Sequence, residues 1–390
     1  MLKWATDTRT LHPILILFLP LAGLLIGLVY HHYGRDVAAG NNLILDEIHN
    51  PKKIIPLRMF PFILLGTIIT HLFGGSAGRE GTAVQMSASL ADQIQSFFHV
   101  EAQERKALLV AGMGAGFGAA IGAPWAGAIF GMEVLHVGKL RLVAWFECFI
   151  ASFVAYYVSR LTHAPHSLYP QLENIGFHWK SFAIVLFFGC LCGLATRAFV
   201  LTTHFFEKII RRYIAYPPFK PLLGGIVLIT LYWLEGSYRY AGLGLPIIQQ
   251  SFVSPSSWEV PLLKGFFTSL TLASGFKGGE FIPLVFMGAT LGSALSLLFK
   301  ISISLMAALG FAAMFAGAAN TPLACTLMAM EIFGPEIAPY ALLACLMSYY
   351  FSGPKGIYGS QKVIRAKHHH WLTLGKYLGE LPKRFLRSQA

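Results

Sequence analysis

A glutamate framed by glycines stands in an apolar part of the chain, within the segment GGSAGREGTAVQMSASL at residues 74–90. Charged side chains are costly in such surroundings, so an ionisable group there is a candidate for function. Glu80 follows Gly78 and Arg79 and precedes Gly81, where a helix is expected to begin. The first turn of a helix has backbone N–H groups without partners and a partial positive charge.

Helix ends of this kind bind anions, and glycine lets the backbone approach an ion closely. Several such ends that meet at mid-membrane form an anion site without a full positive charge, which would hold the ion too tightly. When ionised, Glu80 is itself an anion and would fill this site, whereas in its protonated form it would leave. The segment therefore predicts a gate that also carries a proton. The structural alternative is a helix cap that pairs with Arg79.

A second glycine-framed glutamate, Glu280, lies about 200 positions later in GGEFIPLVFMGATL. A further pair of segments has nearly the same separation: AAIGAPWAGAIFGMEV at 119–134 and GAANTPLACTLMAMEIF at 317–333. In both, small residues precede a proline and an apolar helix that ends in Met-Glu. Two similar separations indicate an internal duplication. Paired interrupted helices in corresponding halves are typical of a transporter with its site near the bilayer midplane.

The elements that must position these residues are membrane helices. Of the 390 residues, 55% are hydrophobic and 12% charged, against roughly a quarter charged in soluble domains. Hydropathy predicts about ten helical segments and a polytopic membrane protein, because a span needs about 20 apolar residues. Short polar connections are expected near 31–58, 161–180 and 203–221. The uncharged runs are 11–30, 59–73, 107–132, 281–299, 301–330 and 337–354.

The net charge of +12 comes from residues in loops and at the chain ends, which indicates membrane topology and not a nucleic-acid site. From 362 to 387 there are seven Lys and Arg against one acidic residue, Glu380. The positive-inside rule predicts that 362–390 is a basic cytoplasmic tail. The run at 11–30 is interpreted as a retained first helix, because no small-residue cleavage site follows it.

No metal or cofactor is predicted. The five cysteines lie in apolar runs without metal-ligand spacing, and the triplet His368 to His370 is interpreted as an exposed part of the tail. An enzyme built on His71, Glu80 and Glu133 is the rival class of protein. It is disfavoured because the chain has no hydrolase or metalloprotease motif.

GREGT, AAIGAPWAGAIFGMEV, GGEFIP and KGIYGSQ, in this order, resemble the CLC family of chloride channels and proton-coupled anion antiporters, from about residue 40 to 361. The resemblance implies an all-α fold of two inverted-topology repeats with broken helices. It also implies a homodimer with one anion pathway in each subunit. We expect a single transmembrane domain over 1–390, with half-repeats at about 11–200 and 201–361 and the tail at 362–390.

The resemblance assigns Glu80 to the external gating position and Tyr358 to the tyrosine that closes the inner side of the central anion site. Asn41 falls where the family usually has a serine that donates to the anion, and Asn42 beside it is the alternative. The remaining residues expected around the anion are Gly78, Arg79, Gly81, Gly279, Glu280, Phe281 and Ile282.

Several departures resemble the fluoride/proton antiporter branch of the family. The segment AGNNLILDEIHNP at 39–51 replaces the usual Gly-Ser-Gly-x-Pro. No second, inward-facing glutamate follows the apolar run at 142–160, where most proton-coupled members have one. Asparagine offers two N–H donors to a strongly hydrated fluoride, where serine offers one O–H. The electropositive ring edges of phenylalanines such as Phe281 are further candidates.

The sequence thus predicts a multi-pass protein of the bacterial inner membrane that exports fluoride in exchange for protons. A chloride channel or a chloride/proton exchanger on the same fold is the alternative. Without a second glutamate, Glu80 is expected to swing far enough to reach the inner water. Glu280 either assists or shapes its loop by bonding backbone amides, and the second role is favoured. The partners are a halide, fluoride before chloride, together with protons, the lipid bilayer and a second copy of the chain.

Overall fold

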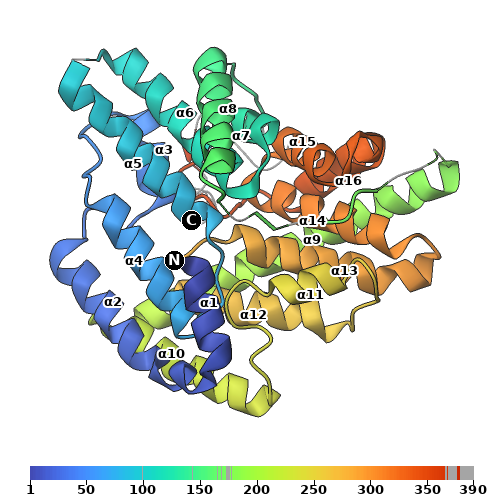
Figure 1. Cartoon of the computed structure of the whole chain (residues 1–390), viewed down its shortest axis with the longest axis horizontal. Helices are drawn as coiled ribbons and strands as arrows, with labels where there is room; N and C mark the ends of the chain where they lie inside the picture. The colour runs from blue at the N-terminus through green and yellow to red at the C-terminus, as the bar shows by residue number, and fades with distance from the viewer. Residues whose placement is uncertain are drawn as a thin grey trace, which may run out of the picture.

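Helices make up nearly all of the regular structure in the computed structural model (Figure 1). The structure describes residues 1–98, 100–142, 144–164, 166–167, 169–172, 176, 178–364, 367 and 376–377. Over these residues it has sixteen α-helices, two short 3-10 helices and three strands of two residues each. The prediction of an all-α fold is confirmed, apart from the small sheet that these three strands form.

The helices of the first part of the chain are α1 (Leu2–Leu11), η1 (Pro13–Phe18), α2 (Leu19–Tyr33), α3 (Asn41–His49), α4 (Met59–Leu72), α5 (Glu80–Phe98), α6 (Ala102–Ile121), α7 (Pro124–Glu133) and α8 (Trp145–Leu161). Those of the second part are α9 (Trp179–Tyr213), α10 (Phe219–Glu235), α11 (Leu245–Gln250), α12 (Glu259–Ala273), α13 (Phe281–Phe299), α14 (Ile303–Ala319), α15 (Pro322–Phe333), η2 (Pro335–Ile337) and α16 (Ala338–Phe351).

Few of these helices are long enough to cross a bilayer alone. In the described part of the chain, the candidates by length and composition are Pro13–Tyr33, Trp179–Tyr213 and Phe281–Phe299. The run at 107–132 breaks where Gly122 has φ +85°, and the run at 301–330 breaks where Asn320 has φ +60°. The prediction of about ten segments was too low, because a 20-residue hydropathy window merges or misses broken and short helices.

Two of the predicted polar connections contain helix. Helix α3 lies inside 31–58, and α9 continues to Tyr213, well into 203–221. A boundary between half-repeats near residue 200 would cut through the middle of α9. We therefore propose that the two halves join before α9, at the connection that follows α8.

The sequence echo corresponds to a reciprocal contact between the halves. The carboxylate of Glu133, at the end of α7, accepts the two backbone N–H groups that follow the proline of α15, at 3.0 and 2.8 Å. The carboxylate of Glu331, near the end of α15, accepts the two N–H groups that follow the proline of α7, at 3.0 and 2.8 Å. The end of each helix thus caps the start of the other, as a two-fold relation between duplicated halves requires.

A small sheet holds the beginning of the predicted tail against the helical body. Strand β1 (His136–Val137) pairs in parallel with β2 (Lys362–Val363), which pairs antiparallel with β3 (Lys376–Tyr377). This sheet was not predicted. Most of the basic tail, including His368 to His370, lies outside the described residues.

Candidate anion pathway

The ends of α5 and α13 are joined through their glycines. The N–H of Gly78 donates to the carbonyl of Gly279 at 2.6 Å, and the N–H of Gly279 donates back to the carbonyl of Gly78 at 2.9 Å. A Cβ atom on Gly78 would lie 2.9 Å from the Gly279 oxygen. Only glycine allows this approach, and it brings the N-terminal ends of the two helices together.

Glu80 is the first residue of α5 and only 2% exposed. One carboxylate oxygen accepts the N–H of Arg79 at 3.1 Å, and the other lies 3.4 Å from the Arg79 Nε. The carboxylate is therefore folded back onto the electropositive end of its own helix. An anion at that helix end would make the same kind of contact.

Asn41 is the first residue of α3 and is 8% exposed. Its Nδ2 lies 3.4 Å from the point where a Cβ on Gly81 would be, so its amide faces the end of α5. The Oδ1 of Asn41 is buried with no partner among the described residues. The neighbouring Asn42 is engaged elsewhere, because its Oδ1 accepts the N–H of Ser360 at 3.1 Å. Of the two asparagines, Asn41 is the one beside the joined helix ends.

Glu280 immediately precedes α13, but its side chain makes no cap hydrogen bond to that helix. The favoured prediction, that this carboxylate shapes its loop by bonding backbone amides, stays a prediction. One carboxylate oxygen lies 3.9 Å from the position of a Cβ on Gly81, and the residue lines a cavity. The backbone nitrogen of Ile282, two residues after Glu280, lies 3.2 Å from the position that a Cβ atom on Gly78 would take.

Phe281 is buried in a cluster of aromatic rings. The rings of Phe117 and Phe315 meet it edge-on, with centroids 5.5 and 4.7 Å away. Phe117 and Phe315 were not predicted, because phenylalanine is frequent throughout the apolar runs and no spacing distinguishes these two.

A cavity of about 180 Å³ opens beside the joined helix ends. It collects predicted site residues from three separate segments: Asn41, Glu280 and Tyr358 all line it. Tyr358 is 6% exposed. Sequence analysis missed the polar residues that complete the lining, some of which lie beside the predicted motifs and some on α9. They include Gln85, His204, Glu207 and Lys277.

A second cavity, of about 570 Å³, is lined by Arg79 and by cationic side chains of other segments, namely Lys3, Arg9 and Arg239. Arg79 borders this cavity and Glu280 borders the first one. The bonded pair of glycines connects the two loops. The buried Glu80, which contacts Arg79, therefore lies at the junction of the two loops that border these cavities.

The residues of the rival enzyme hypothesis take separate partners. His71 Nδ1 bonds the carbonyl of Thr67 at 2.8 Å, while Glu133 bonds the start of α15. Within the described residues, no group of three or more His, Cys, Asp or Glu side chains is arranged to hold a metal ion.

Paired broken helices, joined at glycine-framed ends around a buried carboxylate, define a membrane transport protein of the inverted-repeat class. The chain matches the model of the voltage gated chloride channel family over residues 22–353 and belongs to that family, the CLC family. The resemblance noted in the motifs is thus confirmed, and with it the inverted-repeat, multi-pass membrane fold.

The chain is 47% identical, over 100% of its length and 87% of the relative's, to a "Chloride/fluoride channel protein" from Pseudomonas syringae pv. tomato. Its structure matches the crystal structure of a CLC-type fluoride/proton antiporter with a TM-score of 0.90 at 34% identity, covering 93% of this chain and 92% of the other. A slow cyanobacterial Cl⁻/H⁺ antiporter has the same fold, with a TM-score of 0.78 at 20% identity, over 90% and 88% of the two chains.

Proposed function

We propose that this protein is a fluoride/proton antiporter of the bacterial inner membrane that works as a homodimer and is not an enzyme. The observation that carries this proposal is the buried carboxylate of Glu80 at the joined ends of α5 and α13, with the amide of Asn41 beside it. The names of the two most similar proteins described above, which include fluoride, support the choice of anion.

Exchange of protons for anions follows because the Glu80 carboxylate and the anion compete for one electropositive site. Protonation removes the charge of Glu80, so its side chain leaves the helix end and an anion binds there to the first-turn N–H groups. After losing its proton, Glu80 returns and displaces the anion. Because the carboxylate and the anion alternate, each cycle moves a proton and an anion in opposite directions.

The choice of fluoride rests on hydrogen-bond donors. A small, strongly hydrated anion must regain hydrogen bonds to replace its lost water, and the Nδ2 of Asn41 supplies two N–H donors where serine has one O–H. Electropositive ring edges around Phe281 would add to this. Chloride is the alternative anion. The flux experiment described below compares fluoride with chloride and decides between them.

The cavity lined by Asn41, Glu280 and Tyr358 is proposed to face the cytoplasm. Basic residues crowd the segments next to it, with Arg35, Lys52 and Lys53 in the connection around α3 and Arg211 and Arg212 at the end of α9. Such residues accumulate on the cytoplasmic side. Fluoride would enter through this cavity and leave past Arg79 on the opposite side.

Glu280 is proposed to take part in proton transfer instead of shaping its loop. Its carboxylate lies in the cavity, near Gly81 of the helix that carries Glu80. A Glu80 side chain that swings toward the cavity would bring its proton within reach of Glu280, and thus of the inner water.

The test is flux in vesicles that contain purified protein. A fluoride electrode and a pH electrode record whether a fluoride gradient drives protons uphill, and chloride is substituted in a parallel run. Glu80→Gln cannot lose a proton at that position, so uphill proton movement should fall to background. Asp46→Asn is the control, because Asp46 is exposed on α3 and lines neither cavity.

Uphill proton movement in the Glu80→Gln variant would contradict the mechanism. Equal proton movement with chloride and with fluoride would favour the chloride/proton exchanger.

A further inference from the structure

The cavity beside the site is also lined by polar residues of α9 that the proposed exchange cycle does not yet use. Thr203, His204 and Glu207 all line it, on one face of that helix. His204 and Glu207 are three positions apart, a spacing that places two side chains next to each other on a helix surface. Both are exposed, whereas Glu280, which also lines the cavity, is half-buried.

This acidic residue is unusual for its helix. Glu207 is the one acidic residue in the 35 residues of α9, and it is followed by Lys208, Arg211 and Arg212. Its side chain lines the cavity. His204 is oriented as well, because its Nδ1 contacts the carbonyl of Val200 at 2.7 Å and the other ring nitrogen is left for the cavity or the solvent.

We propose that Glu207, assisted by His204, is the port through which protons pass between the cavity and the cytoplasm. This inference rests on the proposed antiport. Most proton-coupled members of the family have an inward-facing glutamate after the helix that corresponds to α8, and this chain has none there. The proposal assigns the transfer of protons to the cytoplasm to Glu207 of α9 instead. The port and the fluoride entrance then share one cavity.

The transfer itself needs only water and titratable groups. A cavity of about 180 Å³ exceeds by far the roughly 10–15 Å³ that one water needs, so water can connect Glu280 to Glu207. The Glu280 carboxyl gives its proton through this water to the Glu207 carboxylate. Glu207 then releases the proton to bulk water, and each carboxylate ends in its ionised form.

The other charged and titratable groups around the cavity suit this division of roles. Lys277 lies on the loop before α13, with its Nζ 3.9 Å from the centre of the Tyr30 ring of α2. Its positive charge reduces the repulsion that the carboxylates of Glu207 and Glu280 exert on fluoride, so fluoride can still enter the shared cavity. Tyr358 also lines the cavity.

The experiment compares the pH profile of fluoride-driven proton uptake in vesicles for three variants. Glu207→Gln removes the titratable group and should slow uptake about tenfold, below the 10²- to 10⁴-fold that general acid–base groups contribute to chemical steps. Glu207→His restores a titratable group, so it should recover most of the rate and move the profile toward higher pH, because a histidine side chain loses its proton at higher pH than a carboxyl group. Asp46→Asn is the matched control, an exposed carboxylate that lines neither cavity.

Wild-type rate and profile in the Glu207→Gln variant would overturn the port while leaving the antiporter intact. An equally slow Glu207→His variant would also overturn it, because the role would then be structural. If the wild-type protein moves fluoride without protons, both the port and the proposed function fail.

Discussion

At the scale of single residues, the pathway is defined by which polar atoms are left without a partner. The buried Oδ1 of Asn41 has none among the described residues, whereas Asn42 is bonded to the backbone of Ser360. Two adjacent and chemically identical side chains therefore have different roles. The sequence could place an asparagine at this position, but it could not choose between the two, because the choice depends on a loop more than 300 positions away.

Asn41→Ser should lower the preference for fluoride over chloride, because it replaces two N–H donors by one O–H. A hydrogen bond to a charged group contributes about 1.5–3 kcal/mol, so a loss of about tenfold in the flux ratio is expected. The matched control is Asn42→Ser, which makes the same change at the neighbouring side chain, whose Oδ1 is bonded to the backbone of Ser360. If both variants keep the wild-type ratio, Asn41 does not contact the anion.

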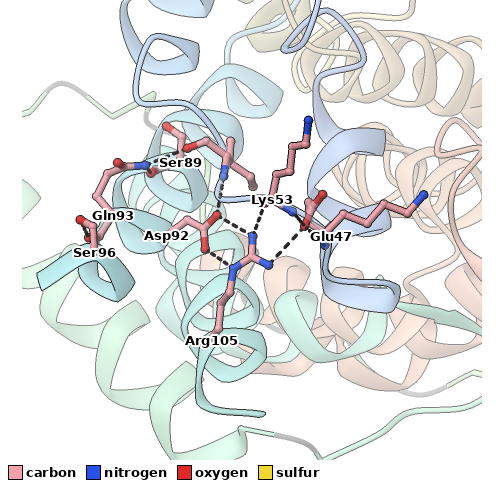
Figure 2. Close-up of polar contacts among 9 residues, drawn as sticks. Glu47, Lys53, Ser89, Asp92, Gln93, Ser96 and Arg105 are labelled. Atoms are coloured by element: carbon pink, nitrogen blue, oxygen red, sulfur yellow. Dashed lines mark hydrogen bonds and ion pairs between the residues drawn. The ribbon is translucent and has the colours of Figure 1, made fainter. Parts of the chain in front are cut away.

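At the scale of helices, the site is positioned by contacts that hydropathy does not reveal. Arg105, at the start of α6, binds both carboxylate oxygens of Asp92 on α5, at 2.7 and 2.8 Å (Figure 2). It also contacts Glu47 of α3 at 3.2 Å and the carbonyl of Lys53 at 2.7 Å. This buried network fixes α3, the helix that begins with Asn41.

The sequence predicted the joined ends of α5 and α13, because glycine-framed glutamates in two halves are a local and repeated signal. It did not predict α3, which is short and amphipathic and lies in a stretch that contains several charges. It also did not predict the network around Arg105. The partners of that network come from three separate segments, and each charge alone resembles an ordinary loop residue.

Arg105→Lys should lower both the thermal stability and the preference for fluoride. A lysine keeps the charge but cannot form the planar, bidentate contact with Asp92 while also reaching Glu47. Helix α3 would then shift, and Asn41 with it. The control is Arg58→Lys, because Arg58 pairs with Asp36 at an exposed position. Melting curves in detergent and flux ratios in vesicles measure the two effects. A less stable variant with unchanged selectivity would show that α3 is held in place by other contacts.

Glu133→Gln tests the reciprocal caps between the halves. The glutamine NH₂ group cannot accept a hydrogen bond, so one of the two N–H groups at the start of α15 loses its partner. An unsatisfied buried donor costs about 1–3 kcal/mol, which should appear as a lower melting temperature. Glu331→Gln should act in the same direction on α7, and the two effects should add, since the caps are at separate helix starts. Unchanged melting in Glu133→Gln would mean that the cap does not stabilise the fold.

At the scale of the whole molecule, one chain contains every group of the proposed pathway. The predicted site residues of both halves meet within it, and the loops that border the two cavities are joined by the bonded pair of glycines. The duplication was visible in the sequence because both halves keep their glycine, proline and glutamate positions. The cavity beside Glu280 was not, because its walls combine side chains from α2, α5, α9 and the loops before α3 and α13.

A pathway complete in one chain predicts independent subunits in the proposed homodimer. Two differently tagged copies, one wild-type and one Glu80→Gln, can be co-expressed and the mixed dimers isolated by both tags. Because the wild-type copy keeps all of its own groups, mixed dimers should carry about half of the fluoride-coupled proton flux of wild-type dimers. Dimers of two variant copies, prepared with the same tags, provide the background. Mixed dimers that fall to this background would mean that the two subunits move together and that a single chain does not contain the whole transport cycle.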